Sequence, residues 1–361
     1  MKDTNIKDLE DSLVFSMSLG NHELFHSNIW AALMKKHPTL VNIFFPEIKK
    51  GVITREKSSV DIEIKDGDKK YFIENKFKSL PNKEQLEKYS NEAGFEKGVL
   101  ISLEEPLFDL PVKWERKDFR KIIESIKNNV AVLDGFDKDL ITNYCDSTIV
   151  AMDMIKEKLG KTDGKWDLEC KDLEKVKLDD IYKKIKGQQL ERKIKDSLKQ
   201  KEITPPEGFD FEIDCGYNNK KPTVSAWLAS KVKHEDEGKK KGDKKIRYGI
   251  QIEGSQYRYM VVFSEETIKG HAKGDSLKWA IDQAFDSRWL EINLEESGRK
   301  SNVSEKNCKC KPHCKYDTNK YKAIYTYFTL KNDTYESIIK NIFEDMERAC
   351  SLVEKFRCYT Q

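Results

Sequence analysis

Residues 59 to 76 have the sequence SVDIEIKDGDKKYFIENK, and this stretch decides the fold of the N-terminal half of the chain. The apolar residues between Val60 and Ile64 alternate with charged ones, which is typical of a strand. Asp66-Gly67-Asp68 is a turn signal, and residues 71 to 77 have the composition of a second strand. The segment therefore predicts a β-hairpin.

The register of this hairpin brings two carboxylates together. If Gly67-Asp68 is the centre of the turn, the numbers of paired residues sum to 135, and Asp61 lies directly across from Glu74. A turn centred one residue earlier makes them diagonal neighbours, which still lie within about 8 Å. Because side chains alternate along a strand, Glu74 and Lys76 share one face while Ile73 takes the other.

Two opposed carboxylates repel each other, and a divalent cation between them removes that cost. Mg²⁺ prefers one or two carboxylates together with waters and phosphate oxygens. Lys76 on the same face would orient or deprotonate a water, or stabilise charge that develops on a phosphate. These groups fit metal-assisted phosphodiester hydrolysis. The simpler alternative is that Asp61 and Glu74 belong to the solvated face of an amphipathic strand.

Two neighbouring segments carry side chains that suit the same chemistry. Gln85 and Tyr89 are four residues apart on a helix predicted over residues 82 to 93, so they face one way and can contact a phosphate or a metal-bound water. Upstream, Glu23 and His26 are three residues apart on one face of a predicted helix. A surface pair at Gln85 and Tyr89, and a partly buried histidine at His26, are the alternatives.

Taken in order, these segments resemble the PD-(D/E)xK nuclease superfamily. Within it, they are most similar to a bacterial branch with an N-terminal Glu-Leu-Phe-His-Ser segment, an Ile-Glu-Asn-Lys strand and a Gln-x-x-x-Tyr helix. The resemblance covers roughly residues 8 to 105, and the proline of the superfamily's name is Val60 here. The matching segments are Glu23 to Ser27, the Arg55-Glu56 pair, Ile73 to Lys76, and Gln85 to Tyr89.

The resemblance implies a restriction-endonuclease-like α/β fold, in which helices flank a mixed sheet. It implies an Mg²⁺-dependent deoxyribonuclease in which Asp61 and Glu74 bind Mg²⁺ or Mn²⁺. Glu23 would add a ligand from the first helix, and Lys76 would position the attacking water. The implied partner is nucleic acid, most simply DNA, in bacterial defence or DNA processing.

The resemblance also makes Gln85 and Tyr89 an accessory pair that places substrate or supports the metal shell, and we add His26 to this set. A homodimer would suit cleavage of both strands of a duplex, and the oligomeric state stays open. One alternative is a non-catalytic nucleic-acid-binding or sensor protein on a nuclease scaffold. Another is an interaction module without a metal.

Composition limits the remaining possibilities. The chain of 361 residues has 66 Lys and Arg against 63 Asp and Glu, so the net charge of +3 excludes a strongly basic nucleic-acid coat. Apolar residues make up 38%, with many aromatics, which excludes a disordered chain. Since no apolar run approaches the roughly 18 residues of a membrane helix and the N-terminus has no signal-peptide pattern, we expect a cytoplasmic protein without membrane spans.

A chain of this length suggests about two domains. The predicted first domain, residues 1–160, is nuclease-like. The predicted second domain, residues 161–361, is strand-rich α+β and would serve substrate recognition, sensing or oligomerisation. The other predicted helices cover residues 6–36, with an interruption at Gly20-Asn21 and a second helix that begins near His22, and residues 115–128, 137–159, 178–199 and 334–356. The other predicted strands lie at residues 99–103, 209–213, 224–228, 248–252, 257–263 and 321–330.

A cysteine cluster lies in a basic stretch, residues 298–320, which we predict to be a loop. Cys308, Cys310, His313 and Cys314 could supply four zinc ligands. The usual pattern of two separated pairs is absent, and adjacent His313 and Cys314 ligate one ion with difficulty. A basic loop with free thiols is therefore the favoured interpretation, and Zn²⁺ is the alternative.

Overall fold

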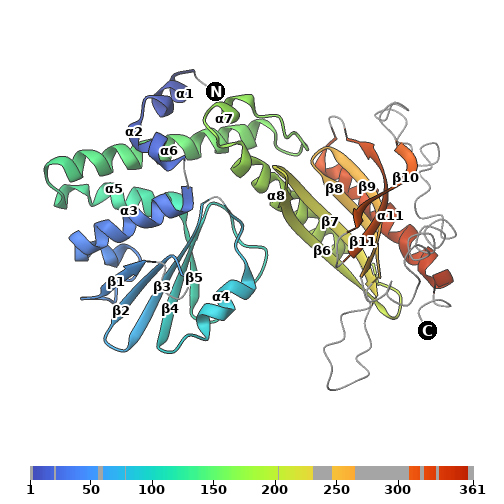
Figure 1. The fold of residues 1–361 in the computed structure, drawn as a ribbon, viewed down its shortest axis with the longest axis horizontal. Coiled ribbons are helices and arrows are strands. Elements are labelled where there is room, and N and C mark those ends of the chain that lie inside the picture. Colours follow the sequence, from blue (N-terminus) through green and yellow to red (C-terminus); the bar gives the residue numbers. More distant parts are fainter. Residues whose placement is uncertain are drawn as a thin grey trace. The chain divides into compact units, whose positions relative to one another are not determined.

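The computed structural model describes residues 3–19, 22–55, 60–77, 79–201, 203–230, 246–264, 309–317, 321–330 and 333–356 (Figure 1). It is a mixed α/β structure with two sheets. The chain forms two compact units: Met1–Lys161 with Glu169–Ile185, and Thr162–Leu168 with Lys186–Gln361. The predicted boundary at residue 160 lies next to the end of the first segment, whereas Glu169–Ile185 returns to the first unit.

The first unit contains a five-stranded mixed sheet in the order β1-β2-β3-β4-β5. The first three strands pair antiparallel, and β3, β4 and β5 run parallel. Its strands are β1 (Val52–Arg55), β2 (Ile62–Asp66), β3 (Lys69–Lys76), β4 (Phe95–Ser102) and β5 (Trp114–Asp118). Its helices are α1 (Asp3–Glu10), α2 (Leu13–Ser18), α3 (His22–Lys36), α4 (Lys83–Ser90), α5 (Phe119–Asn128), α6 (Gly135–Lys161) and α7 (Lys171–Lys175), with the short 3-10 helices η1 (Pro38–Ile43) and η3 (Val130–Val132) and the start of α8 (Asp179–Lys201).

The predicted register of the β2–β3 hairpin is confirmed. Ile62 lies opposite Ile73 and Asp66 lies opposite Lys69, so the paired residue numbers sum to 135. Gly67 takes the positive φ of 61° that this tight turn requires, and glycine adopts it without a steric cost.

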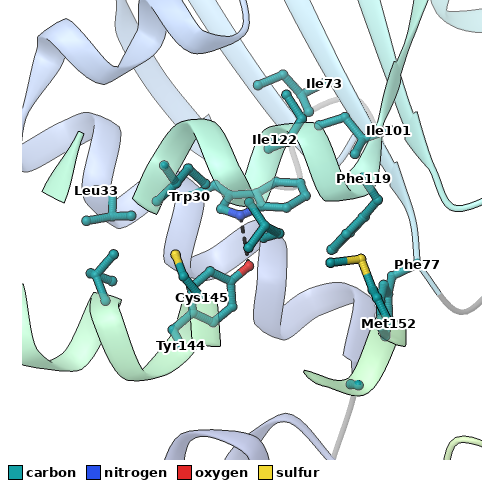
Figure 2. Packing of buried hydrophobic residues seen from close by; sticks show 14 of the residues in the cluster. Trp30, Leu33, Ile73, Phe77, Ile101, Phe119, Ile122, Tyr144, Cys145 and Met152 are labelled. Atoms are coloured by element: carbon teal, nitrogen blue, oxygen red, sulfur yellow. Dashed lines mark hydrogen bonds between the residues drawn. The ribbon is translucent and has the colours of Figure 1, made fainter. Parts of the chain in front are cut away.

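One face of the sheet is covered by helices of the N-terminal segment, including α3, and by α5 and α6. Ile73 and Phe77 are buried there with Trp30 of α3 and Phe119 of α5 (Figure 2). Trp30 Nε1 donates a hydrogen bond of 2.9 Å to the hydroxyl of Tyr144 in α6, which satisfies both polar groups inside the cluster. This face is the large hydrophobic core of the unit.

The opposite face of the sheet packs against α4. Phe72 and Leu100 are buried there together with Leu86 and Tyr89 of α4 and Trp114 of β5. In Figure 1, α3, α5 and α6 lie together on one side of this sheet and α4 lies apart from them. The sheet is thus covered on both faces, which explains why residues 71–73 of β3 and 99–101 of β4 are apolar on both sides.

Three secondary-structure predictions for this unit need correction. The helix predicted over residues 115–128 begins as the strand β5, and Asp118 then caps α5 by accepting a hydrogen bond from the Lys121 N–H. The strand was missed because its charged residues hide the pattern. Within residues 6–36, the second helix predicted to begin near His22 is confirmed as α3, whereas the part before it forms two helices, α1 and α2. The strand β1 was not predicted as a separate element.

The second unit is α+β. Its six strands form an antiparallel sheet in the order β10-β11-β9-β8-β7-β6. Apolar residues of α8 and α11, such as Ile194 and Ile338, pack with Val224 and Ile250 of this sheet. Its elements are β6 (Phe209–Asn218), β7 (Lys221–Ser230), β8 (Ile246–Glu253), β9 (Gln256–Ser264), β10 (Lys309–Asp317), β11 (Tyr321–Thr329), the later part of α8, and α11 (Tyr335–Phe356).

The prediction of a loop over residues 298–320 is wrong for Lys309–Asp317, which form β10 and pair with β11. This pairing shifts register between Lys309 and His313 and again between Cys314 and Tyr316. Such irregularity removes the simple alternation by which a strand is recognised in sequence. Among the residues that the structure describes, no helix contains an apolar stretch of membrane-spanning length.

A glycine in β4 gives a test of this packing. A Cβ added at Gly98 would lie 2.5 Å from a ring carbon of Trp114, so we expect Gly98→Ala to destabilise the first unit by about 1–3 kcal/mol. Gly160→Ala in α6 is the matched control, since a Cβ there meets nothing within 4 Å and alanine favours a helix. Thermal unfolding followed by circular dichroism should show a lower melting temperature for Gly98→Ala only; equal behaviour of the two variants would contradict this packing.

Candidate functional site

The last residues of β3 carry a lysine–carboxylate pair on the face that α4 covers. Lys76 Nζ lies 2.8 Å from Glu74 Oε1. Gln85 of α4 donates from Nε2 to the same Glu74 oxygen at 2.9 Å and to the Tyr89 hydroxyl at 2.7 Å. The structure thus brings together four of the residues that the sequence singled out, and Gln85 links the α4 pair to the strand.

Asp61 joins this group from the position just before β2. It directly precedes the Ile62–Ile73 pair, so the register continues to Asp61 opposite Glu74. The backbone N–H of Asn75 donates to Asp61 Oδ2 at 2.8 Å, which holds the carboxylate against β3. The two carboxylates interact electrostatically, because the charge of Asp61 acts on the ionisation of Glu74.

Burial dominates the electrostatics of Glu74. Its side chain is 3% exposed, and this burial, reinforced by the negative charge of Asp61, raises the pKa of the carboxyl from 4.5 to about 7. The Lys76 ammonium opposes the rise, though it does not cancel it. The same buried environment and the charge of Glu74 raise the pKa of Tyr89. At neutral pH the Glu74 carboxyl is therefore poised between its two protonation states.

The donor set fits a hard divalent cation. Glu74 Oε1 accepts from Lys76 and Gln85, whereas Glu74 Oε2 is buried and has no hydrogen-bond partner among the described residues. A buried carboxylate oxygen without a partner is costly, and a cation beside it would remove that cost. Mg²⁺ and Mn²⁺ prefer such carboxylate oxygens, and Asp61 lies on the facing strand.

The outcome differs for Glu23 and His26, the two predicted site residues of α3. Glu23 belongs to α3, and its side chain lies outside the described residues. His26 is buried in the aromatic cluster on the α3 side of the sheet, where its ring centroid lies 4.5 Å from that of Phe77 and its Nδ1 lies 2.8 Å from the Tyr144 hydroxyl. His26 thus serves the core in this structure and is not grouped with Glu74. The helical spacing did not reveal which face α3 presents.

The predicted zinc ligands cannot be placed as a site. Cys308 lies outside the described residues, and Cys310, His313 and Cys314 lie in β10 with side chains outside them. A different group, Cys170 with Glu174 and Asp179, has ligand atoms within 4.8 Å of one another. Lys183 Nζ lies 2.8 Å from Asp179 Oδ2 and 3.9 Å from Glu174 Oε1, so the Lys183 ammonium already balances the charge of these two carboxylates.

Several polar residues near the site had no predicted role, although Ser27, Arg55 and Asn75 lie in the segments that carry the resemblance. Asn75 donates from Nδ2 to Ser27 Oγ at 3.1 Å, and Arg55 donates from Nε to Asn28 Oδ1 at 2.9 Å. A polar residue at 75, on the strand face that otherwise holds Ile73 and Phe77, was the available signal. Glu63, two residues after Asp61 and on the same face of the sheet, is fully buried.

Comparison of the chain with family models, with curated proteins and with solved structures gives no match.

The raised pKa of Glu74 predicts a pH-dependent stability in metal-free protein. Between about pH 4.5 and 7 the folded protein holds a proton that the unfolded chain has lost, so the free energy of unfolding falls as pH rises through this window. Above pH 7 the ionised carboxylate carries its full burial cost. Glu74→Gln cannot ionise, so its melting temperature should rise relative to wild type between pH 5 and pH 8 in EDTA.

Glu96→Gln is the control for this measurement, since Glu96 is a half-exposed residue paired with Lys69 on the same sheet. Its difference from wild type should stay nearly constant between the two pH values. A Glu74→Gln difference that is also constant would show that the carboxyl titrates near its ordinary pKa.

Proposed function

We propose that the first unit is a restriction-endonuclease-like nuclease of the PD-(D/E)xK type, which hydrolyses phosphodiester bonds with a divalent cation. The sheet supports this fold, because a β1–β2–β3 meander is followed by parallel β4 and β5 with helices on both faces. The proposed activity rests on the resemblance of the Ile73–Lys76 and Gln85–Tyr89 segments to the motifs of this superfamily.

One observation carries the proposal: the carboxylate of Glu74 is buried beside Lys76 and Asp61 with one oxygen left without a hydrogen bond among the described residues. A fold gains little from this arrangement, since desolvating a carboxylate next to another acid is unfavourable. A divalent cation bound between the two carboxylates would offset this cost and give the arrangement a function.

Each residue then has a role that its position allows. Asp61 and Glu74 would hold Mg²⁺ or Mn²⁺, which supplies Lewis-acid stabilisation of negative charge on the phosphate oxygens. Lys76 would hold the attacking water and stabilise charge that develops in the transition state. Gln85 orients the Glu74 carboxylate through the 2.9 Å hydrogen bond, and Tyr89 in turn fixes the Gln85 amide.

DNA is the proposed substrate class, and the second unit is proposed to select it or to control cleavage. The support for DNA is the resemblance of the motif residues. The near-neutral charge of the chain agrees with a site in which the cation, rather than a basic surface, meets the phosphate.

Single substitutions in the triad test the proposal. We expect Asp61→Ala, Glu74→Ala and Lys76→Ala each to lower the cleavage rate by about 10²-fold or more, since each removes a group used in the transition state. Lys69→Ala is the matched control, because Lys69 is on the same strand and also forms an ion pair with a glutamate, yet is exposed. It should cleave like wild type.

The assay uses linear, circular and single-stranded DNA, and RNA, in Mg²⁺, Mn²⁺ or EDTA. Cleavage by wild type that requires the cation and is lost in the triad variants supports the nuclease and identifies its substrate. Binding of nucleic acid without cleavage, whatever the cation, would favour a non-catalytic protein on this scaffold. Undiminished cleavage by all three variants excludes the site.

A further inference from the structure

The helix α3 contacts the strands of the candidate site from the side opposite α4. We propose that Ser27 and Asn28 of α3, acting through Asn75 and Arg55, form a positioning network that holds the Asp61 carboxylate toward Glu74 and so sets the affinity of the site for a divalent cation. This inference rests on the proposed function, because it assigns these residues a task at the same site.

The first arm of the network runs through Asn75. This residue stands between Glu74 and Lys76, so its side chain points to the other face of the sheet, where Nδ2 donates to Ser27 Oγ at 3.1 Å. Its backbone N–H donates to Asp61 Oδ2 at 2.8 Å. Asn75 is 1% exposed and Ser27 is fully buried. One residue thus ties α3 to the strand and, through the strand, to the carboxylate.

The second arm runs through Arg55, the last residue of β1. Its Nη1 donates to the main-chain carbonyl of Asp61 and lies 3.9 Å from Asp61 Oδ1. Its Nε donates to Asn28 Oδ1 at 2.9 Å. The guanidinium is rigid and planar, so fixing one edge on Asn28 aims the other edge at Asp61.

Asp61 is supported on two sides. The Asn75 N–H holds Oδ2 of the carboxylate, and the Arg55 guanidinium binds the main-chain carbonyl of Asp61 and lies near Oδ1. Partners that orient a metal ligand in this way commonly change metal affinity by about 10–100-fold when they are removed.

Asn28 offers the cleanest test, since it is exposed and its substitution spares the core. We expect Asn28→Ala to weaken Mn²⁺ binding, measured by calorimetry on the full chain, by about tenfold. Asn28→Asp should retain wild-type binding, because its carboxylate accepts the same hydrogen bond from Arg55. The metal concentration that gives half-maximal cleavage should rise in Asn28→Ala, while the rate at saturating metal stays close to wild type.

Arg120→Ala is the control, because Arg120 bridges Glu124 and Asp153 on α5 and α6 without touching the site. It should bind Mn²⁺ like wild type. If wild type binds no Mn²⁺, or Glu74→Ala binds it equally well, the proposed function fails and the network fails with it. If wild type binds, Glu74→Ala does not, and Asn28→Ala matches wild type, the network alone is wrong. Equal weakening in Asn28→Ala and Asn28→Asp would also overturn it, since the hydrogen bond would then not be the cause.

Discussion

The pairing of β2 with β3 is the constraint on which the candidate site depends. Side chains alternate with a period of two, so the register decides at once which residues meet α3 and which meet α4. A slip of one residue would turn Glu74 and Lys76 into the aromatic core and expel Ile73 from it. The apolar cluster therefore also fixes the positions of the polar site residues, because a change of register would disrupt both faces of the sheet.

The candidate site lowers the stability of the first unit. Glu74 is buried beside a second acid, and the Lys76 ammonium compensates this only in part. Buried ion pairs are poor stabilisers in general, because the cost of desolvation rivals the attraction. The large cluster around Trp30 and Phe119 supplies the apolar burial that lets the sheet tolerate such a group.

Much of this arrangement could be predicted from the sequence, for physical reasons. The turn at Gly67 and the alternation around Asp61 are local, so the hairpin register and the shared face of Glu74 and Lys76 were predicted correctly. The pairing of Gln85 with Tyr89 also depends only on helical spacing. Three features depend on packing between segments far apart in the sequence, which no local pattern encodes. They are the choice of which face of α3 is buried, the formation of the strand β5 and the burial of Glu63. That is why His26 was grouped with the site, whereas it lies in the core.

The order of segments in the two units has a consequence for synthesis on the ribosome. The core of the first unit includes Leu173, Leu178 and Tyr182, which follow the Thr162–Leu168 segment of the second unit along the chain. Domains generally fold as they emerge, N-terminal first. Here the core of the first unit lacks these side chains until residue 185 has left the exit tunnel, so the apolar surface that they cover is exposed until then.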